Sequence, residues 1–364
     1  MRITTKMTAD NSLFNINEGR IKLDTLNEKI SSGKQVNRPS DDPVATRKIL
    51  DVETQIKNSS QIISNIKTGQ TWLSLTGTSL EGLLSTVMDI KSTAGQAVGS
   101  ISDPVKKADM LGQLKMFRDQ LMDYTDAKVG NQYIFSGFKS EKTPFVSTSI
   151  PADITAGSPA ITNIDATNLY PGLPISGPGI PANSTVAAIT TPGVGGAITI
   201  SNPATVTTIP GTGTLTFSGM FQGTDDQLNI DVGGRVPVAM NVSAGAVLRG
   251  TQGGVDIIKT LDTLIAAITS GDVAGIQTAN IDLDKANQQV LSAVSDVGMR
   301  KARLENSLTS QERNGNTLRA IHDGMQNIDM AAAAIALTQQ KTAFDAALAA
   351  TAKIMPLSLL DYMR

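Results

Sequence analysis

The chain has 364 residues, of which 40% are hydrophobic and only 4% aromatic, with a single Trp. Its formal net charge of −2 gives no basic footprint, so we expect no nucleic-acid partner. The absence of cysteine excludes disulfides and thiolate metal sites. No apolar run is long enough for a membrane span, and residues 1–7 lack the apolar region of a signal peptide. We therefore expect no membrane span, and any export is expected to occur without a cleaved signal peptide.

The first predicted element is a helix over residues 1–30. Leu13, Ile16, Leu23 and Ile30 follow a seven-residue pattern, and the last three share one heptad position. The helix should end at Ser31, Ser32 and Gly33, because Gly33 can take the left-handed conformation that closes a helix.

A connector then leads into a long second helix. It has the sequence Asn37, Arg38, Pro39, Ser40, Asp41, Asp42, Pro43. Ser40 or Asp42 can accept hydrogen bonds from the free amides of the next helix, and Pro43 suits its first position. That helix is expected over 44–97, where one heptad position holds Val52, Ile66, Leu73, Leu80 and Val87. A third helix should begin after Asp103 and run to about residue 129.

The pattern changes at Gly130. Residues 133–138 predict a short aromatic strand, and no Lys or Arg occurs between Lys142 and Arg235. Runs of β-branched residues separated by Gly, Pro and Asn predict strands over 185–189, 197–200, 214–217, 228–232 and 236–242. The sequence thus predicts an all-β insertion.

Helical periodicity returns at Val255 and ends at Gly271, after which Asp272 can cap a further helix. That pattern runs almost unbroken to the C-terminal segment, with Gly315 and Gly324 as candidate points for a bend or break. The segment from Ile321 to Tyr362 has high helix propensity and a narrow apolar stripe, so it needs a partner. Its candidate interface residues are Ile328, Ile335, Phe344, Leu348, Met355 and Leu359.

The predicted fold is mainly α with an inserted all-β domain. The N- and C-terminal regions form a long antiparallel helical bundle or coiled coil, and the β-domain sits at the turning point. Residues 1–42 and 318–364 are expected to be terminal helical assembly segments, and 43–140 with 250–317 a helical rod. Residues 141–249 are expected to be β-rich and to include an added module at about 154–217.

Four stretches carry a resemblance to the flagellin superfamily: residues 1–4, 30–43, 130–137 and 346–362. The connector with its two prolines and the Ser-Leu-Leu-Asp-Tyr ending favour the branch that joins hook to filament. This resemblance implies an extracellular structural protein of the bacterial flagellum, whose terminal helices pack in the tube wall. A filament subunit is the alternative, and a surface adhesin with a carbohydrate-binding β-module is a third reading.

The same resemblance implies the partners. These are a neighbouring hook-associated protein on the hook side, flagellin on the filament side, other copies of the chain in a ring, and a cytoplasmic export chaperone for the C-terminal segment. The assembly interface is expected to comprise the apolar residues already named in both terminal helices, from Leu13 to Ile30 and from Ile328 to Leu359.

No constellation of catalytic or metal-binding residues is apparent, so we expect neither an enzyme nor a cofactor. The one histidine, His322, lacks the partners that a general base or a zinc site needs, and we expect a solvated helix histidine. Asp41 with Asp42 and Asp225 with Asp226 lack further oxygen ligands at calcium-loop spacing, which favours turn and cap roles.

Overall fold

The computed structural model describes residues 5–167, 169–181, 184–209, 212–251 and 253–362. The side chains of 5–6, 8–9 and 353–362 lie outside that description. The chain forms two compact units. Unit 1 contains residues Met1–Gln61 and Ser310–Arg364, and unit 2 contains Ile62–Thr309.

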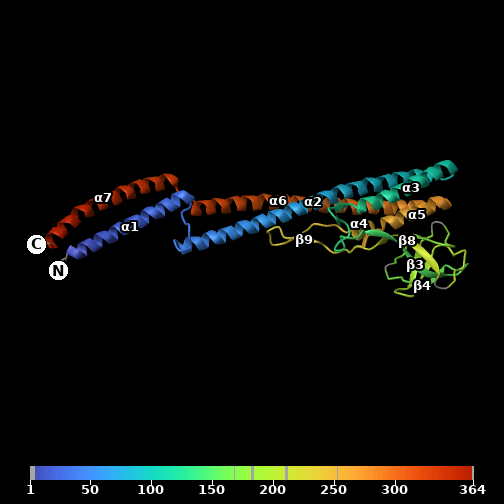
Figure 1. The fold of residues 1–364 in the computed structure, drawn as a ribbon. Coiled ribbons are helices and arrows are strands. Elements are labelled where there is room, and N and C mark those ends of the chain that lie inside the picture. Colours follow the sequence, from blue (N-terminus) through green and yellow to red (C-terminus); the bar gives the residue numbers. More distant parts are fainter. Residues whose placement is uncertain (1–4, 168, 182–183, 210–211, 252, 363–364) are drawn as a thin grey trace. The chain divides into compact units, whose positions relative to one another are not determined.

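Unit 1 is built from the two ends of the chain. Helix α1 (Thr5–Ser32) lies antiparallel to helix α7 (Met330–Tyr362), as Figure 1 shows. The unit also contains the first turns of α2 (Pro43–Ser100) and the last turns of α6 (Val273–Gln326). The predicted pairing of the two termini is therefore present within one chain.

The helical core of unit 2 contains α2, α3 (Pro104–Thr125), α5 (Ile257–Ser270) and α6. Buried residues recur every seven positions along both long helices: Ile66, Leu73, Leu80 and Val87 on α2, and Ile276, Leu283, Val290, Val297 and Leu304 on α6. A strict seven-residue repeat keeps one stripe facing a partner helix over many turns. The heptad predicted for the second helix is confirmed in this unit.

The predicted start of α3 and the predicted end of α5 are also confirmed, whereas α3 ends at Thr125 and not near residue 129, because Lys128 and Val129 form a short strand. The Asp103 side chain accepts hydrogen bonds from the first amides of α3, with Pro104 at the first helical position. Gly271 ends α5 with a φ of 80°, in the left-handed region that favours glycine. Local capping chemistry therefore fixes these helix ends.

A β-module is inserted between the helices of unit 2. Its strands are β3 (Phe145–Ile154), β4 (Ala160–Ile164), β5 (Ile175–Ser176), β6 (Val186–Thr191), β7 (Gly196–Ile200) and β8 (Gly213–Phe221). They form one antiparallel sheet in the order β5-β8-β3-β4-β7-β6. The module has an apolar core of its own, which includes Ile161, Ile198 and Phe217.

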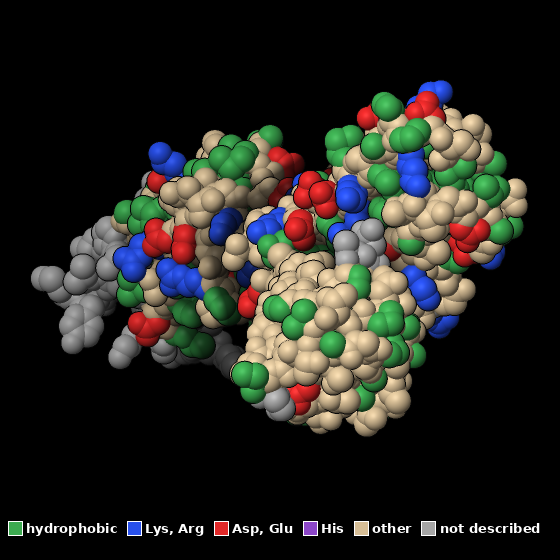
Figure 2. Space-filling view, turned by 90° about the vertical axis from the view of Figure 1, so that its right-hand side faces the viewer, with side chains coloured by type: hydrophobic (Ala, Val, Ile, Leu, Met, Phe, Trp, Pro, Cys, Tyr) green, Lys and Arg blue, Asp and Glu red, His purple; other side chains and the backbone are tan. Residues whose placement is uncertain are grey.

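The module's sheet extends beyond the predicted limits of 154–217. Phe145 on β3 pairs with Phe221 on β8, and their ring centroids lie 5.5 Å apart. The two strands that enter and leave the module are therefore neighbours. Between residues 146 and 224 the only charged residues are Asp153 and Asp165, and the module, in the lower foreground of Figure 2, shows few charged side chains.

Small elements join the module to the helices. Strand β1 (Lys128–Val129) pairs with β2 (Gln132–Tyr133), β9 (Asn229–Ile230) pairs with β10 (Val238–Ala239), and α4 (Ala244–Leu248) follows.

Several predicted strands are shorter or missing in the structure. The strand predicted over 133–138 is wrong beyond Tyr133, because Ile134 and Phe135 are buried in the helical core without joining a strand. The strands predicted over 228–232 and 236–242 shrink to two residues each. The helical pattern passes through Gly315 and Gly324 without a break and ends only at Gln326.

The fold class predicted from the sequence is confirmed. Helices from both chain ends flank a separate antiparallel β-domain. None of the helices in the described ranges is long and apolar enough to cross a membrane.

Candidate assembly interface

The contact between α1 and α7 follows a regular spacing, and we call it the seam. Half-buried positions on α1 recur at intervals of three and four residues: Ile16, Gly19, Leu23, Leu26 and Ile30. On α7 the buried and half-buried positions follow the same rule: Ala333, Leu337, Gln340, Phe344, Ala347 and Thr351. This is the spacing of two helices that pack through one stripe each.

Gly19 allows the two helices to approach closely. A β-carbon added there would lie 3.1 Å from Cδ2 of Phe344, so the phenyl ring occupies the space beside the glycine. The Gln340 side-chain amide also donates to the Gly19 carbonyl oxygen at 3.5 Å. The seam is thus a specific contact with one aromatic side chain near its middle.

A second set of apolar residues faces away from the seam, and we call it the outer face. Phe14 is 69% exposed and Leu13 is 56% exposed on α1, while Ile335 is 61% and Leu348 is 42% exposed on α7. Met7, Phe14 and Ile21 are all exposed and lie seven residues apart, which places them on one side of α1. Such a stripe of large apolar side chains marks an interaction surface.

The structure divides the predicted interface residues between these two surfaces. Ile16, Leu23, Ile30 and Phe344 lie in the seam, whereas Leu13, Ile335 and Leu348 lie on the outer face. The sequence analysis placed Phe344 and Leu348 on one stripe, but Phe344 is half-buried and Leu348 is exposed. Met355 and Leu359 belong to the last turns of α7, where side chains are outside the described part. The assembly role of the whole set stays a prediction.

The sequence analysis missed Met7 and Ile21 as members of the outer face. The signal was available, because Met7, Phe14 and Ile21 form a heptad of their own beside that of Ile16, Leu23 and Ile30. Two interleaved heptads on one helix indicate two packing surfaces.

The two connectors of unit 1 run side by side. Gly33, with a φ of 70°, ends α1, and its carbonyl oxygen accepts a hydrogen bond from the amide of Ile328 at 3.0 Å. Lys34 forms an antiparallel bridge with Asn327, and the amide of Gln35 donates to the Gln326 carbonyl at 2.7 Å. Ile328 is therefore half-buried at this junction.

The acidic pair of the connector acts locally, as expected. Asp41 accepts a hydrogen bond from the amide of Arg38 at 2.9 Å, and the Arg38 guanidinium lies 3.2 Å from a carboxylate oxygen of Glu28. Asp42 accepts from the amides of Val44 and Ala45 at 3.0 and 2.8 Å, and Pro43 is the first residue of α2. Asp42 is thus the cap, whereas Ser40 is exposed.

The other residues of the connector motif have local positions. Ser32 donates to the Lys29 carbonyl oxygen at 3.2 Å, Asn37 is half-buried, and Ser31 and Pro39 are exposed. Asp329 performs the same capping task for α7, since it accepts from the amides of Ala331 and Ala332 at 2.9 and 3.1 Å.

His322 differs from the expectation of a solvated histidine. Its side chain is only 17% exposed, with Nε2 3.4 Å from Glu53 on α2 and Nδ1 3.3 Å from Asp323. It therefore links α6 to α2 within unit 1. The described residues contain no group of side chains that could hold a metal ion.

The sequence matches two family descriptions at its two ends. Residues 3–140 match the bacterial flagellin N-terminal helical region, and residues 281–363 match the bacterial flagellin C-terminal helical region. Together the two matches span more than half of the chain. They cover α1, α2, α3, α7 and most of α6, and they leave out the β-module, α4 and α5.

Two curated relatives bear the same name. The chain is 32% identical over 152 residues to flagellar hook-associated protein 3 of Salmonella typhimurium, and 28% identical over 152 residues to flagellar hook-associated protein 3 of Escherichia coli. Each alignment covers 40% of this chain and 46% of the relative, so the chain spans about half the length of the curated relatives it matches.

A solved structure extends the likeness in fold. It comes from Vibrio parahaemolyticus, carries a flagellar hook-associated name, and superposes with a TM-score of 0.54 at 18% identity. The superposition covers 79% of this chain and 100% of that structure. The two family matches, which together span more than half of the chain, show that it belongs to the bacterial flagellin superfamily.

Proposed function

We propose that this chain is a structural adaptor of the bacterial flagellum, which joins the hook to the filament through its terminal helices. The observation that carries the proposal is the outer face, because helices paired in the seam still present Phe14, Ile335 and Leu348 to solvent. The matches of both helical regions to flagellin, and the hook-associated name shared by the curated relatives, support this role over that of an enzyme.

The packing of unit 1 leaves apolar surface that only assembly with neighbouring subunits can bury. The α1–α7 pair buries one stripe of each helix, while ordering backbone costs about 1–2 kcal/mol per residue. Neighbouring subunits that cover the outer face supply the missing burial. The expected neighbours are other copies of the chain in a ring, a hook-associated protein on the hook side and flagellin on the filament side.

The same argument bears on export. An uncovered apolar stripe on α7 would aggregate before assembly, so we propose that a cytoplasmic chaperone covers the C-terminal segment until export. The resulting location is extracellular, within the flagellum.

The test is to locate the chain on the flagellum. The turn between β6 and β7 contains Val194, which is 86% exposed, so an epitope tag inserted beside it should leave the helices undisturbed. Immunogold electron microscopy should then place gold only where hook meets filament. Label along the whole filament would identify a filament subunit instead, and label on the cell body would favour an adhesin.

A further inference from the structure

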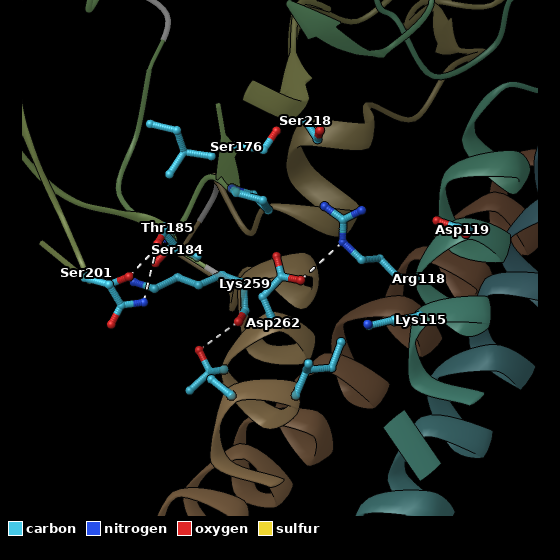
Figure 3. A pocket seen from close by; sticks show the side chains of 17 residues that line it. Lys115, Arg118, Asp119, Ser176, Ser184, Thr185, Ser201, Ser218, Lys259 and Asp262 are labelled. Carbon is cyan, nitrogen blue, oxygen red and sulfur yellow. Dashed lines mark hydrogen bonds and ion pairs between the residues drawn. The ribbon is translucent and has the colours of Figure 1, made fainter. Parts of the chain in front are cut away.

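A cleft of about 580 Å³ lies where the β-module meets the helices of unit 2. Residues of α3 and α5 form one wall, and loops and strands of the module form the other. Figure 3 shows Lys115 and Arg118 on α3, Lys259 and Asp262 on α5, and the hydroxyl groups of the module opposite them. A cleft of this volume is large enough for a small molecule.

The helical wall carries unbalanced positive charge. Arg118 donates from Nε to Asp262 at 3.2 Å, and the two side chains are largely buried. The amino groups of Lys115 and Lys259 take no hydrogen-bond or ion-pair partner among the described residues. Since Asp262 is already paired, Asp119 is the one further carboxylate of the lining. The excess of amino groups favours an anion.

The module wall offers hydroxyl groups and no charge. It contributes Ser176, Ser184, Thr185, Ser201 and Ser218, together with the side chain of Asn202. None of the described residues that line the cleft is aromatic, so a nucleobase or another flat ring has no described side chain to stack against. The Ser184 hydroxyl already donates to the Pro181 carbonyl oxygen at 2.6 Å, and the Ser201 hydroxyl accepts from the Thr185 amide at 3.0 Å. Each hydroxyl oxygen can still accept a further hydrogen bond, so this wall suits a ligand that carries several hydroxyl groups.

The floor of the cleft has hydrogen-bonding capacity left over. Nη2 of Arg118 and Oδ2 of Asp262 are buried and have no hydrogen-bond partner in the described part of the chain. An unpaired buried donor and an unpaired buried acceptor are both costly. A hydroxyl group both donates and accepts, so one that entered after a small rotation of these side chains would serve both atoms.

We propose that this cleft binds a hydroxylated carboxylate of single-sugar size, that is, a sugar acid. The amino groups of Lys115 and Lys259 attract its carboxylate, and its hydroxyl groups face the serines and threonines of the module. The ligand contacts both walls, which gives the β-module a role separate from assembly.

The experiment is an isothermal titration, in which D-glucuronate is added to the whole chain and the heat of binding is recorded by calorimetry. D-Glucose, which keeps the hydroxyl groups but lacks the carboxylate, and acetate, which keeps only the carboxylate, are the comparison ligands. Glucuronate should bind saturably, and each comparison ligand should bind at least about tenfold more weakly, because each forfeits one set of contacts.

Variants distinguish binding of glucuronate in the cleft from a general attraction of the anion to lysines on the surface. Lys115→Gln with Lys259→Gln should weaken glucuronate binding at least about tenfold, whereas Lys139→Gln, an exposed lysine outside the cleft, should leave it unchanged. Amide shifts on ligand addition, recorded on the unaltered chain, should centre on Ser176 and Thr185. Absence of saturable binding, equal binding of acetate, full affinity in the double variant, or shifts elsewhere would overturn the proposal.

Discussion

Replacing Phe14 by Asp should abolish assembly while leaving the monomer almost unchanged. Phe14 is 69% exposed, so less than a third of its surface contributes to the monomer. Full burial of a Phe side chain contributes about 1.5–3 kcal/mol, which leaves the monomer at most about 1 kcal/mol to lose. Covered by a neighbour, the variant forfeits about 1–2 kcal/mol and buries an unpaired carboxylate at a cost of several kcal/mol more, in every subunit.

The assay compares the two states directly. Purified monomer should keep its circular dichroism and its melting temperature, while cells that carry the variant should form hooks without filaments and release flagellin into the medium. Phe14→Leu is the matched control, because it keeps an apolar side chain and should still permit filaments. Normal swimming of the Phe14→Asp cells would refute the assignment of the outer face.

A substitution in the seam should behave differently. Phe344 packs beside Gly19 within the same chain, so Phe344→Ala removes a contact that the monomer already has. Because the ring is only half-buried, the cost should be about 1–3 kcal/mol, below that of a fully buried Phe. Limited proteolysis of the monomer should then cut α1 and α7 faster than in the unaltered chain or in Phe14→Asp. Equal cleavage rates in the two variants would mean that the seam and the outer face are not distinct surfaces.

Three further predictions concern unit 2. Gly82→Ala places a β-carbon 2.4 Å from Cε1 of Tyr124, so it should destabilise the helical core by about 1–3 kcal/mol in a denaturant titration. Gly112→Ala is the control, because the space around Gly112 is open and the free energy of unfolding should not change. Excision of residues 146–220 should preserve filaments and leave the helices of unit 2 folded, as measured by circular dichroism. Phe145 and Phe221 are cross-strand neighbours, so an Asn-Gly turn can join them. Loss of helical signal or of cooperative unfolding in the shortened chain would contradict this. Burial raises the pKa of Asp262 to about 6, and Arg118 opposes that rise, so Arg118→Met should raise the pKa further in a carboxyl NMR titration. The folded chain holds this proton between about pH 3.8 and about 6, so its stabilising contribution is complete below pH 3.8 and lost as the pH rises through 6; a pKa that falls in the variant would contradict the assigned cause.

The helices could be predicted from the sequence because their signals are local. The stop at Gly33, the cap at Asp42 and the heptads of α2 each depend on a few neighbouring residues. The strands were harder to predict from the sequence. Residues 133–138 have strand propensity, yet Ile134 and Phe135 fill the helical core instead, because burial in that core outweighs the propensity.

The candidate interface could be predicted only in part. Periodicity identified the apolar residues of both termini, but a heptad does not state whether its partner lies in the same chain or in another. The close approach of Gly19 to Phe344 assigns one stripe to the seam, and it leaves Phe14 and Leu348 for the outer face. The cleft beside the module could not be predicted from the sequence, because Lys115, Ser176 and Lys259 line the same cleft only in the folded chain.

The central claim is that assembly buries the outer face, and the absence of native cysteine allows it to be measured at single sites. Cysteine is introduced singly at Phe14, Leu348 or Val194, and its rate of reaction with a maleimide is compared between the monomer and isolated flagella. Phe14→Cys and Leu348→Cys should react readily in the monomer and become strongly protected after assembly. Val194→Cys, on an exposed turn of the module, should react at the same rate in both states. Equal reactivity of Phe14→Cys in monomer and assembled flagella would contradict the account.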